Sequence, residues 1–215
     1  MDSTTVPGMQ IHGRVAPGFE RVREAFAANF ERDDAYREAG AALAVYRGGE
    51  CVVDLWGGVA DRAGTRPWMR ETLINVYSTT KGLVAALVAM LVDDGVLDYD
   101  APLVRWWPEF GAAGKEATTL AHLLSHQAGL TGFQEHAAVE DLYDWDAACA
   151  RLARQAPCWP PGTVSSYHAM TWGFLVGEVI RRAVGAGVGA LCGERLRAAL
   201  GADVFIGLPH DAQAR

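Results

Sequence analysis

Cysteines are few in this sequence and lie far apart. No two of them form a Cys-x-x-Cys pair, the close spacing that zinc sites and redox-active dithiols usually show. We therefore expect buried, reduced thiols in a cytoplasmic protein, with neither a disulfide nor a metal site. The four are Cys51, Cys149, Cys158 and Cys192.

The sequence also lacks a basic region and a long apolar run. It has 19 Lys and Arg against 26 Asp and Glu, so nucleic acid and anionic membranes are not expected as partners. The longest apolar run, residues 83–92, is far shorter than the roughly twenty residues of a membrane span. The first eight residues show no signal-peptide pattern, which favours a cytoplasmic location. With 215 residues, 50% of them hydrophobic, the chain can bury a sizeable core.

Only two lysines occur, and one of them follows a serine by three positions. In the sequence Ser-Thr-Thr-Lys at residues 78–81, the two side chains share a face if a helix begins at Ser78. The apolar run that follows predicts this helix, apolar on every side and hence buried, ending near Gly95. A serine beside Lys81, at the positive end of the helix dipole, can become a nucleophile without a histidine.

The rest of the pattern predicts a helix, a β-hairpin and then a long helical block. Apolar residues at helical spacing predict a helix over 17–32, and the runs 41–46 and 51–56 around a glycine turn predict the hairpin. Residues 204–209 could begin a strand. A two-stranded sheet is marginal alone, so either another chain completes it or the rest of the domain lies outside this sequence. Within the block, helices are expected over 98–107, 118–125, 141–155, 171–184 and 191–200.

A second candidate catalytic group follows the rigid Pro-Pro-Gly turn at residues 160–162. Tyr167 could be an ordinary core aromatic residue. Near a lysine ammonium, however, the pKa of its phenol would fall below the usual value of about 10. The phenolate could then take the proton of a serine hydroxyl and return it to the leaving group. His168, beside it, could tune this group or point into solvent.

Together these motifs resemble the serine β-lactamase-like superfamily, specifically its class C β-lactamase and family VIII carboxylesterase branch, which includes D-alanyl-D-alanine carboxypeptidase-type enzymes. The resemblance rests on Ser78–Lys81, on Thr119–Leu130 and on the turn that leads into Tyr167, and it spans nearly the whole chain in order. It implies Ser78 as the acylated nucleophile, Lys81 as its activating partner and Tyr167 as general base or acid, with no cofactor and no metal. Ser-x-x-Lys is a known nucleophile motif.

The fold that the resemblance implies is α/β (α+β), β-lactamase/transpeptidase-like, with an antiparallel sheet flanked by helices and a helical region. Residues 1–215 would be the N-terminal part of one hydrolase domain, with the C-terminal sheet strands and last helix absent from this chain. Its expected parts are the helix and hairpin of the sheet region over 14–77, the nucleophile helix over 78–94, the helical region over 95–202 and the start of the return to the sheet over 203–215.

The sequence departs from the family pattern at two points. Ala169 stands where the family's Tyr-x-Asn has asparagine, so a polar contact to Lys81 or to substrate is missing or supplied otherwise. No Lys-Thr-Gly, His-x-Gly or Trp-x-Gly motif, the family's source of a second oxyanion N–H, follows Tyr167. We therefore expect weak or no turnover by this chain.

The function is left with several alternatives. Because a cytoplasmic location is expected, a small-molecule carboxylic ester is favoured as substrate over β-lactams and D-alanyl peptides. The alternative is a non-catalytic fragment or pseudo-enzyme that binds a partner or forms a homo-oligomer through its unfinished sheet edge.

Other side chains in the helical block have two interpretations each. His122 and His126 are four apart on a predicted helix, a metal-binding spacing, but no third ligand is evident and structural histidines are favoured. The aromatic residues of the block could wall an acyl pocket, although most should be ordinary core. They are Phe133, Tyr143, Trp145, Trp159 and Trp172.

Overall fold

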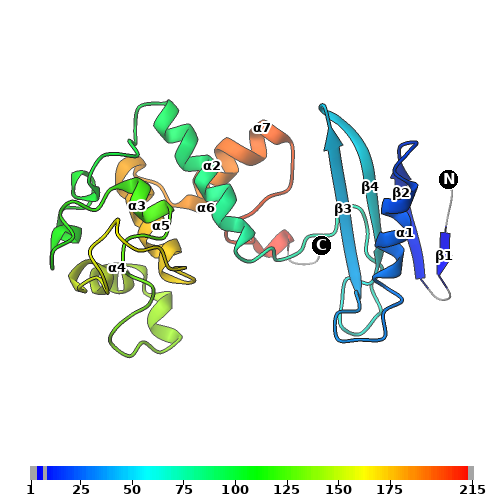
Figure 1. Ribbon diagram of the computed structural model, residues 1–215, viewed down its shortest axis with the longest axis horizontal. Coiled ribbons are helices and arrows are strands. Elements are labelled where there is room, and N and C mark those ends of the chain that lie inside the picture. Colours follow the sequence, from blue (N-terminus) through cyan, green and yellow to red (C-terminus); the bar gives the residue numbers. More distant parts are fainter. Residues whose placement is uncertain (1–3, 7–8, 213–215) are drawn as a thin grey trace. The chain divides into compact units, whose positions relative to one another are not determined.

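The computed structural model describes residues 4–6 and 9–212 and divides the chain into two compact units, one holding Met1–Ile74 and the other Asn75–Gln213 (Figure 1). This boundary lies close to the predicted one between the sheet region and the nucleophile helix. The nucleophile helix and the helical region, predicted as separate parts, belong to the same unit. In the described part of the chain, no helix combines the length and apolarity that crossing a membrane requires.

The first unit is a four-stranded antiparallel sheet, in the order β1–β2–β4–β3, packed against one helix. The predicted hairpin is confirmed: β3 and β4 pair around Gly48 and Gly49, whose φ angles of 57° and 83° suit glycine. The elements are β1 (Thr4–Val6), β2 (Met9–Val15), α1 (Glu20–Ala28), β3 (Gly40–Arg47) and β4 (Glu50–Gly58).

The expectation of a two-stranded sheet was wrong, because β2 pairs with β4 and β1 pairs with β2. The sequence signal of β2 is weak because Gly13 interrupts its apolar alternation. The structure needs that glycine: its φ is +96°, and an added Cβ would lie 1.9 Å from the carbonyl oxygen of Asp54. In a strand, glycine often marks such a close backbone approach.

The second unit is helical, and α5 (Thr171–Val184) is its most buried element. Leu175, Val176, Val179 and Ile180 of α5 are fully buried. The α5 boundaries match the prediction, and Gly185 ends the helix in the left-handed conformation. The other α-helices are α2 (Thr79–Asp93), α3 (Leu120–Leu124), α4 (Trp145–Arg154), α6 (Val188–Cys192) and α7 (Ala198–Leu200), with a π-helical turn over Gly193–Arg197 between the last two.

Helix α2 is amphipathic rather than buried all round, which corrects the prediction. Val84, Leu87, Val88 and Leu91 face the core at helical spacing, while the opposite face, built from alanine and glycine, is exposed. The sequence disguises this pattern because small residues stand where charged ones usually mark a solvent face. The helix ends as predicted, just before Gly95, whose φ is +73°.

Two further expectations fail in the second unit. Instead of one helix over 98–107, two 3₁₀ turns form, Leu103–Arg105 and Pro108–Gly111, because the prolines before and within this segment cannot donate the N–H groups of a longer helix. Residues 203–212 contain no strand, so the strand expected to begin over 204–209 does not form. Val204 and Ile206 pack instead against the helical core, and a 3₁₀ turn follows over His210–Ala212.

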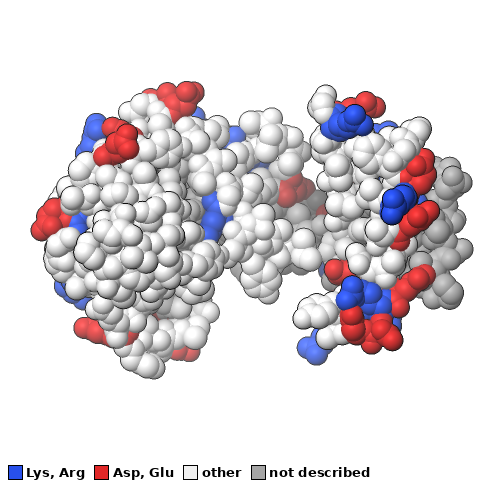
Figure 2. Space-filling view, viewed as in Figure 1, with Lys and Arg blue, Asp and Glu red and all other residues white. Residues whose placement is uncertain are grey.

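The second lysine of the chain is structural. Lys115 is fully buried, and its ammonium donates hydrogen bonds to the carbonyl oxygens of Ala112 (2.6 Å), Ala153 (3.0 Å) and Gln155 (2.5 Å). Two of these carbonyls lie at the C-terminal end of α4, where a cation also interacts favourably with the negative end of the helix dipole. Both rare lysines therefore occupy specialised positions. Elsewhere, charged residues of both signs are scattered over the face seen in Figure 2.

Candidate active site

Ser78 is the N-cap residue of α2, and the backbone before it is strained. Tyr77 has a φ of +47°, the left-handed region that costs an ordinary residue roughly 1–2 kcal/mol. The three backbone N–H groups that follow Ser78 donate to carbonyls of the preceding turn at 3.0 to 3.1 Å. This sharp turn presents the Ser78 hydroxyl at the positive end of α2. Strain of this kind tends to occur at functional sites.

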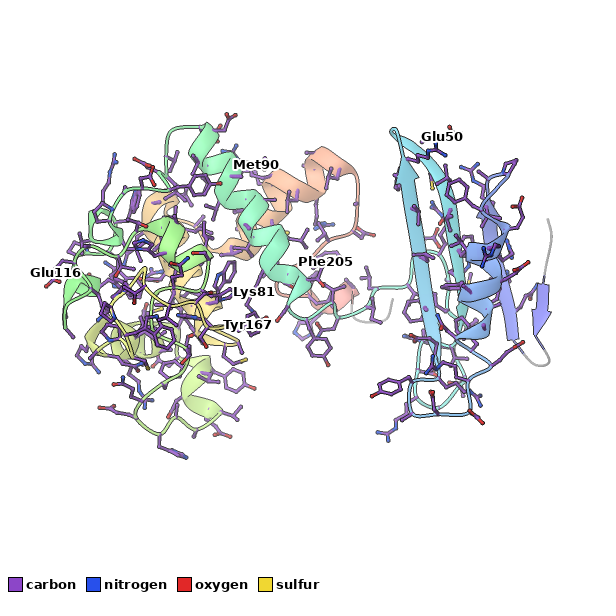
Figure 3. The ribbon with its side chains drawn as sticks, in the orientation of Figure 1. Glu50, Lys81, Met90, Glu116, Tyr167 and Phe205 are labelled. Carbon is purple, nitrogen blue, oxygen red and sulfur yellow. The ribbon has the colours of Figure 1, made fainter. Side chains whose placement is uncertain are left out.

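Lys81 lies one turn into α2, and its ammonium points back at the serine. Its Nζ donates hydrogen bonds to Ser78 Oγ and to the carbonyl oxygen of Ala169, both at 3.0 Å. The second contact means that the backbone carbonyl of Ala169 accepts a hydrogen bond from Lys81, although the asparagine of the family pattern is missing at this position. The same ammonium lies 4.9 Å from the ring centroid of Tyr167, with the two labelled side chains adjacent in Figure 3.

The Tyr167 phenol completes the group. Hydrogen bonds with Ser78 and Lys81 lower the pKa of this phenol, and the ammonium of Lys81 lowers it further by its charge. The side chain is half exposed, at 53%. The structure thus brings together the three side chains that the sequence analysis named, Ser78, Lys81 and Tyr167, and Tyr167 is not a core aromatic.

A loop after α3 fixes the backbone on both sides of Tyr167. The carbonyl oxygen of His126 accepts the N–H of Ser166, and Nδ1 of His126 accepts the N–H of His168, each at 3.1 Å. The imidazole of His126 also packs on the phenol ring, with the centroids 4.8 Å apart. His126 has a φ of +63°, so the loop turns sharply to make these contacts. This anchoring role was not apparent from the sequence.

His168 is fully buried, so the expectation that it could point into solvent was wrong. The N–H of Leu130 donates to its Nε2 at 3.0 Å, which places the proton on Nδ1, where it is donated to the carbonyl oxygen of Ser166 at 2.6 Å. Burial lowers the pKa of His168, which keeps this neutral form. The histidine therefore ties the tyrosine segment to Leu130, joining two motifs that lie far apart in the sequence.

His122 has a structural role in the helix that carries it, as favoured above. Its Nδ1 accepts the N–H of Thr119 while the Thr119 hydroxyl accepts the N–H of His122, a reciprocal cap at the start of α3. Within residues 4–6 and 9–212, no three histidine, cysteine or acidic side chains are grouped so that they could hold a metal ion.

A cavity of about 430 Å³ opens beside Ser78 and Lys81. Two of the five aromatic residues proposed for an acyl pocket, Trp145 and Trp172, line it, whereas Phe133, Tyr143 and Trp159 do not. Phe174 also lines the cavity and was not among the residues predicted for it, although the helical spacing from Met170 onward marks this face of α5. The lining residues are Tyr77, Ser78, Thr80, Lys81, Val84, Trp145, Ala169, Met170, Trp172, Gly173, Phe174, Val188 and Ile206.

Comparison with known proteins gives consistent results. The family model described as Beta-lactamase matches residues 26–215. The Esterase/beta-lactamase LipL of Mycobacterium tuberculosis is 40% identical over 210 residues, which cover 97% of this chain and 48% of LipL. The crystal structure of a family VIII carboxylesterase matches with a TM-score of 0.88 and 49% identity, over 95% of this chain and 56% of that chain.

A penicillin-binding protein homologue from Caulobacter crescentus matches equally well in structure. Its TM-score is 0.88 at 45% identity, over 95% of this chain and 54% of that chain. The fold is therefore β-lactamase/transpeptidase-like, with a small antiparallel sheet and a helical region, as the motifs implied. The chain spans about half the length of the relatives it matches.

Proposed function

This chain belongs to the beta-lactamase family, and on that premise we propose that it carries the nucleophile of a serine hydrolase that cleaves carboxylic esters through an acyl-enzyme on Ser78. Relatives described as esterases and beta-lactamases support hydrolysis at the level of the family. The observation that carries the proposal is the 3.0 Å contact between Lys81 Nζ and Ser78 Oγ, with the Tyr167 ring centroid 4.9 Å from the same ammonium and the pKa of its phenol lowered by both residues.

The proposed acylation begins when the Tyr167 phenolate takes the Ser78 proton. The Ser78 oxygen then attacks the ester carbonyl carbon and forms a tetrahedral intermediate. As the intermediate collapses, the bond to the alcohol oxygen breaks and Tyr167 returns the proton to the departing alcohol. The Lys81 ammonium stabilises the phenolate form by its charge, which lets a phenol act as base near neutral pH.

Deacylation reverses the roles. A water molecule gives its proton to the Tyr167 phenolate and attacks the acyl carbon, and the Ser78 oxygen leaves with the proton that Tyr167 returns. In both steps the backbone N–H of Ser78, at the start of α2, donates to the oxyanion. Removing one such donor costs about 3 kcal/mol in other enzymes, which is the contribution that this N–H would make to the stability of the transition state.

An alkyl fluorophosphonate, which reacts only with an activated serine, tests this proposal together with hydrolysis of a p-nitrophenyl ester. We expect one covalent adduct per chain and its loss in Ser78→Ala. Thr79→Val is the matched control, because it removes the neighbouring hydroxyl at the same helix end, and it should leave labelling intact. Labelling that persists in Ser78→Ala would reject the assignment.

The second candidate is a non-catalytic module that forms homo-oligomers. One observation favours it: β3 is the edge strand of the sheet order β1–β2–β4–β3, and edge strands invite pairing with a second chain. A dimer fraction that increases with protein concentration, in a protein that the fluorophosphonate does not label, would support it.

A third option, which keeps the serine hydrolase of the first proposal, is β-lactamase or D-Ala-D-Ala carboxypeptidase activity. A β-lactam and a D-alanyl peptide, used as substrates in the same assay, test this option.

A further inference from the structure

We propose that a second cavity, between the C-terminal end of α4 and residues 133–135, binds a small carboxylate that carries a flat apolar group, as aromatic acids do. The cavity has a volume of about 220 Å³. In the described part of the chain it shares no lining residue with the cavity beside Ser78, so this inference does not rest on the proposed function.

Hydrogen bonds tie the two sides of this cavity together. The side chain of Gln155, the residue after α4, accepts the N–H of Gln134 at 3.0 Å and donates to the carbonyl oxygen of Gly132 at 2.8 Å. The side-chain amide of Gln134 in turn donates to the carbonyl oxygen of Ala156 at 2.9 Å. Because both glutamines are engaged in this way, the walls are held in place before any ligand arrives, as a preformed site requires.

One of the two arginines at this cavity is free to bind an anion. Arg151 and Arg154 lie one turn apart on α4, and both line the cavity. Arg151 is engaged, because its guanidinium pairs with Asp141 at 3.3 Å and donates to the carbonyl oxygen of His136 at 2.7 Å. The guanidinium of Arg154 forms no hydrogen bond or ion pair with any residue that the structure describes. The planar fork of an arginine matches the two oxygens of a carboxylate.

The charges around Arg154 favour a ligand with a single negative charge. The carbonyls at the end of α4 form the negative end of its dipole, but those of Ala153 and Gln155 accept hydrogen bonds from the buried ammonium of Lys115, which offsets this charge. Glu135 also lines the cavity, and its carboxylate is 84% exposed and faces the other arginine at 3.9 Å. A dianion such as phosphate would keep a negative charge beside Glu135, whereas Arg154 alone neutralises a carboxylate.

The Phe133 ring, which also lines the cavity, favours a flat apolar group on the ligand. The ring is contacted by the Arg151 guanidinium, 5.5 Å from its centroid, and by the ring of Phe174 at 6.2 Å between centroids. A flat group that packs on this ring gains apolar burial and the preferred geometry of aromatic pairs. The cavity is smaller than the roughly 300–1,000 Å³ of sites for drug-sized ligands, so the ligand is a small molecule.

Binding of para-fluorobenzoate, measured by fluorine NMR, tests this site without any use of catalysis. We expect saturable binding with a Kd on the order of 1 mM. Arg154→Met keeps an unbranched side chain but removes the charge, and it should weaken binding by about tenfold or more, the fold-change that corresponds to about 1.5 kcal/mol for a hydrogen bond to a charged group. The Tm of this variant should match that of the wild type, because the exposed guanidinium has no partner to lose.

Matched controls separate the charge of the ligand from its shape. Arg62→Met removes the same charge from an exposed arginine outside the lining and should leave binding unchanged. The uncharged analogue para-fluorobenzamide, and inorganic phosphate measured by competition, should each bind at least about tenfold more weakly than the carboxylate. Phosphate or the amide binding as tightly as the carboxylate would overturn the proposed ligand class.

The ammonium of Lys81, in the other cavity, is the competing site for a carboxylate. Lys81→Met distinguishes the two sites and should leave the binding of para-fluorobenzoate unchanged. Binding that is lost in Lys81→Met and kept in Arg154→Met would overturn the proposal. The absence of saturable binding at millimolar concentrations, or equal weakening by Arg154→Met and Arg62→Met, would overturn it as well.

Discussion

Replacing Glu178 with glutamine should destabilise the protein in a pH-dependent way. Glu178 lies in the middle of α5, almost fully buried, and accepts hydrogen bonds from Trp145, Arg181 and Arg182. Burial by itself would raise the pKa of this carboxyl group, but the hydrogen bonds from the two arginines and the indole outweigh it and lower the pKa to about 2. Glutamine has nearly the same shape and can still accept the indole N–H, so the change removes mainly the charge.

The magnitude follows from that pKa. A fall of the pKa from the ordinary value of 4.5 for this carboxyl group to about 2 corresponds to roughly 3 kcal/mol, at about 1.4 kcal/mol per pKa unit. Removing one partner of a buried ion pair costs about 3–5 kcal/mol in general, but both arginine side chains are partly exposed and can turn to water. We therefore expect Glu178→Gln to lower the free energy of unfolding by about 2–3 kcal/mol near neutral pH, or the Tm by roughly 5–10 °C.

The sign of the pH dependence is fixed by the direction of the shift. Because the pKa is lower in the folded state, the stabilisation is fully present above about pH 4.5 and is lost as the pH falls towards about 2. Urea unfolding of both proteins from about pH 7 down to about pH 3 should show the difference shrinking. Glu194→Gln, which removes an exposed carboxylate facing Arg195 at 3.7 Å, is the control and should cost under about 0.5 kcal/mol. A loss below about 1 kcal/mol near pH 7, or one independent of pH, would refute this reasoning.

Three further predictions concern the site and its support. Lys81→Met and Tyr167→Phe should each slow acylation by about 10²–10⁴-fold. The acylation rate of the wild-type protein should rise as the pH passes through the lowered pKa of the Tyr167 phenol. Rapid-quench measurements of the acylation rate over a pH series check both expectations. His126→Asn should keep acylation within several-fold, since asparagine tolerates the left-handed backbone and can accept the N–H of His168. His126→Phe should lower kcat more than it raises KM and should shift the pH profile, and equal effects of both substitutions would contradict an anchoring role. Gly129→Ala should cost about 2 kcal/mol or more in thermal unfolding, because residue 129 has a φ of +72° and an added Cβ would lie 2.8 Å from a proline ring; an unchanged Tm would disprove it.

The helix that begins after Ser78 could be predicted because its signals are local. The serine–lysine spacing, the apolar run and the glycine after it all act within one segment, and α5 is equally well marked by its apolar period and Gly185. The family and the fold that these motifs implied are confirmed by the matches to known proteins. The roles of Ser78, Lys81 and Tyr167 and the cytoplasmic location stay predictions.

The features that escaped prediction depend on contacts between distant segments. Strand β2 is recognisable only once β4 offers a partner, because Gly13 breaks its alternation. Residues 204–209 have the composition of a strand, but Val204 and Ile206 pack against the helical core. His126 and His168 hold Tyr167 through backbone groups some forty residues away, and no local pattern encodes such pairings.

The most direct measurement is to map the covalent adduct formed when the protein is mixed with p-nitrophenyl butyrate and quenched within one turnover. The account predicts a single butyryl group on the peptide that contains Ser78, formed much more slowly in Lys81→Met and Tyr167→Phe. A butyryl group on any other residue, or equal rates of acylation in all three proteins, would contradict the claim that these side chains act together.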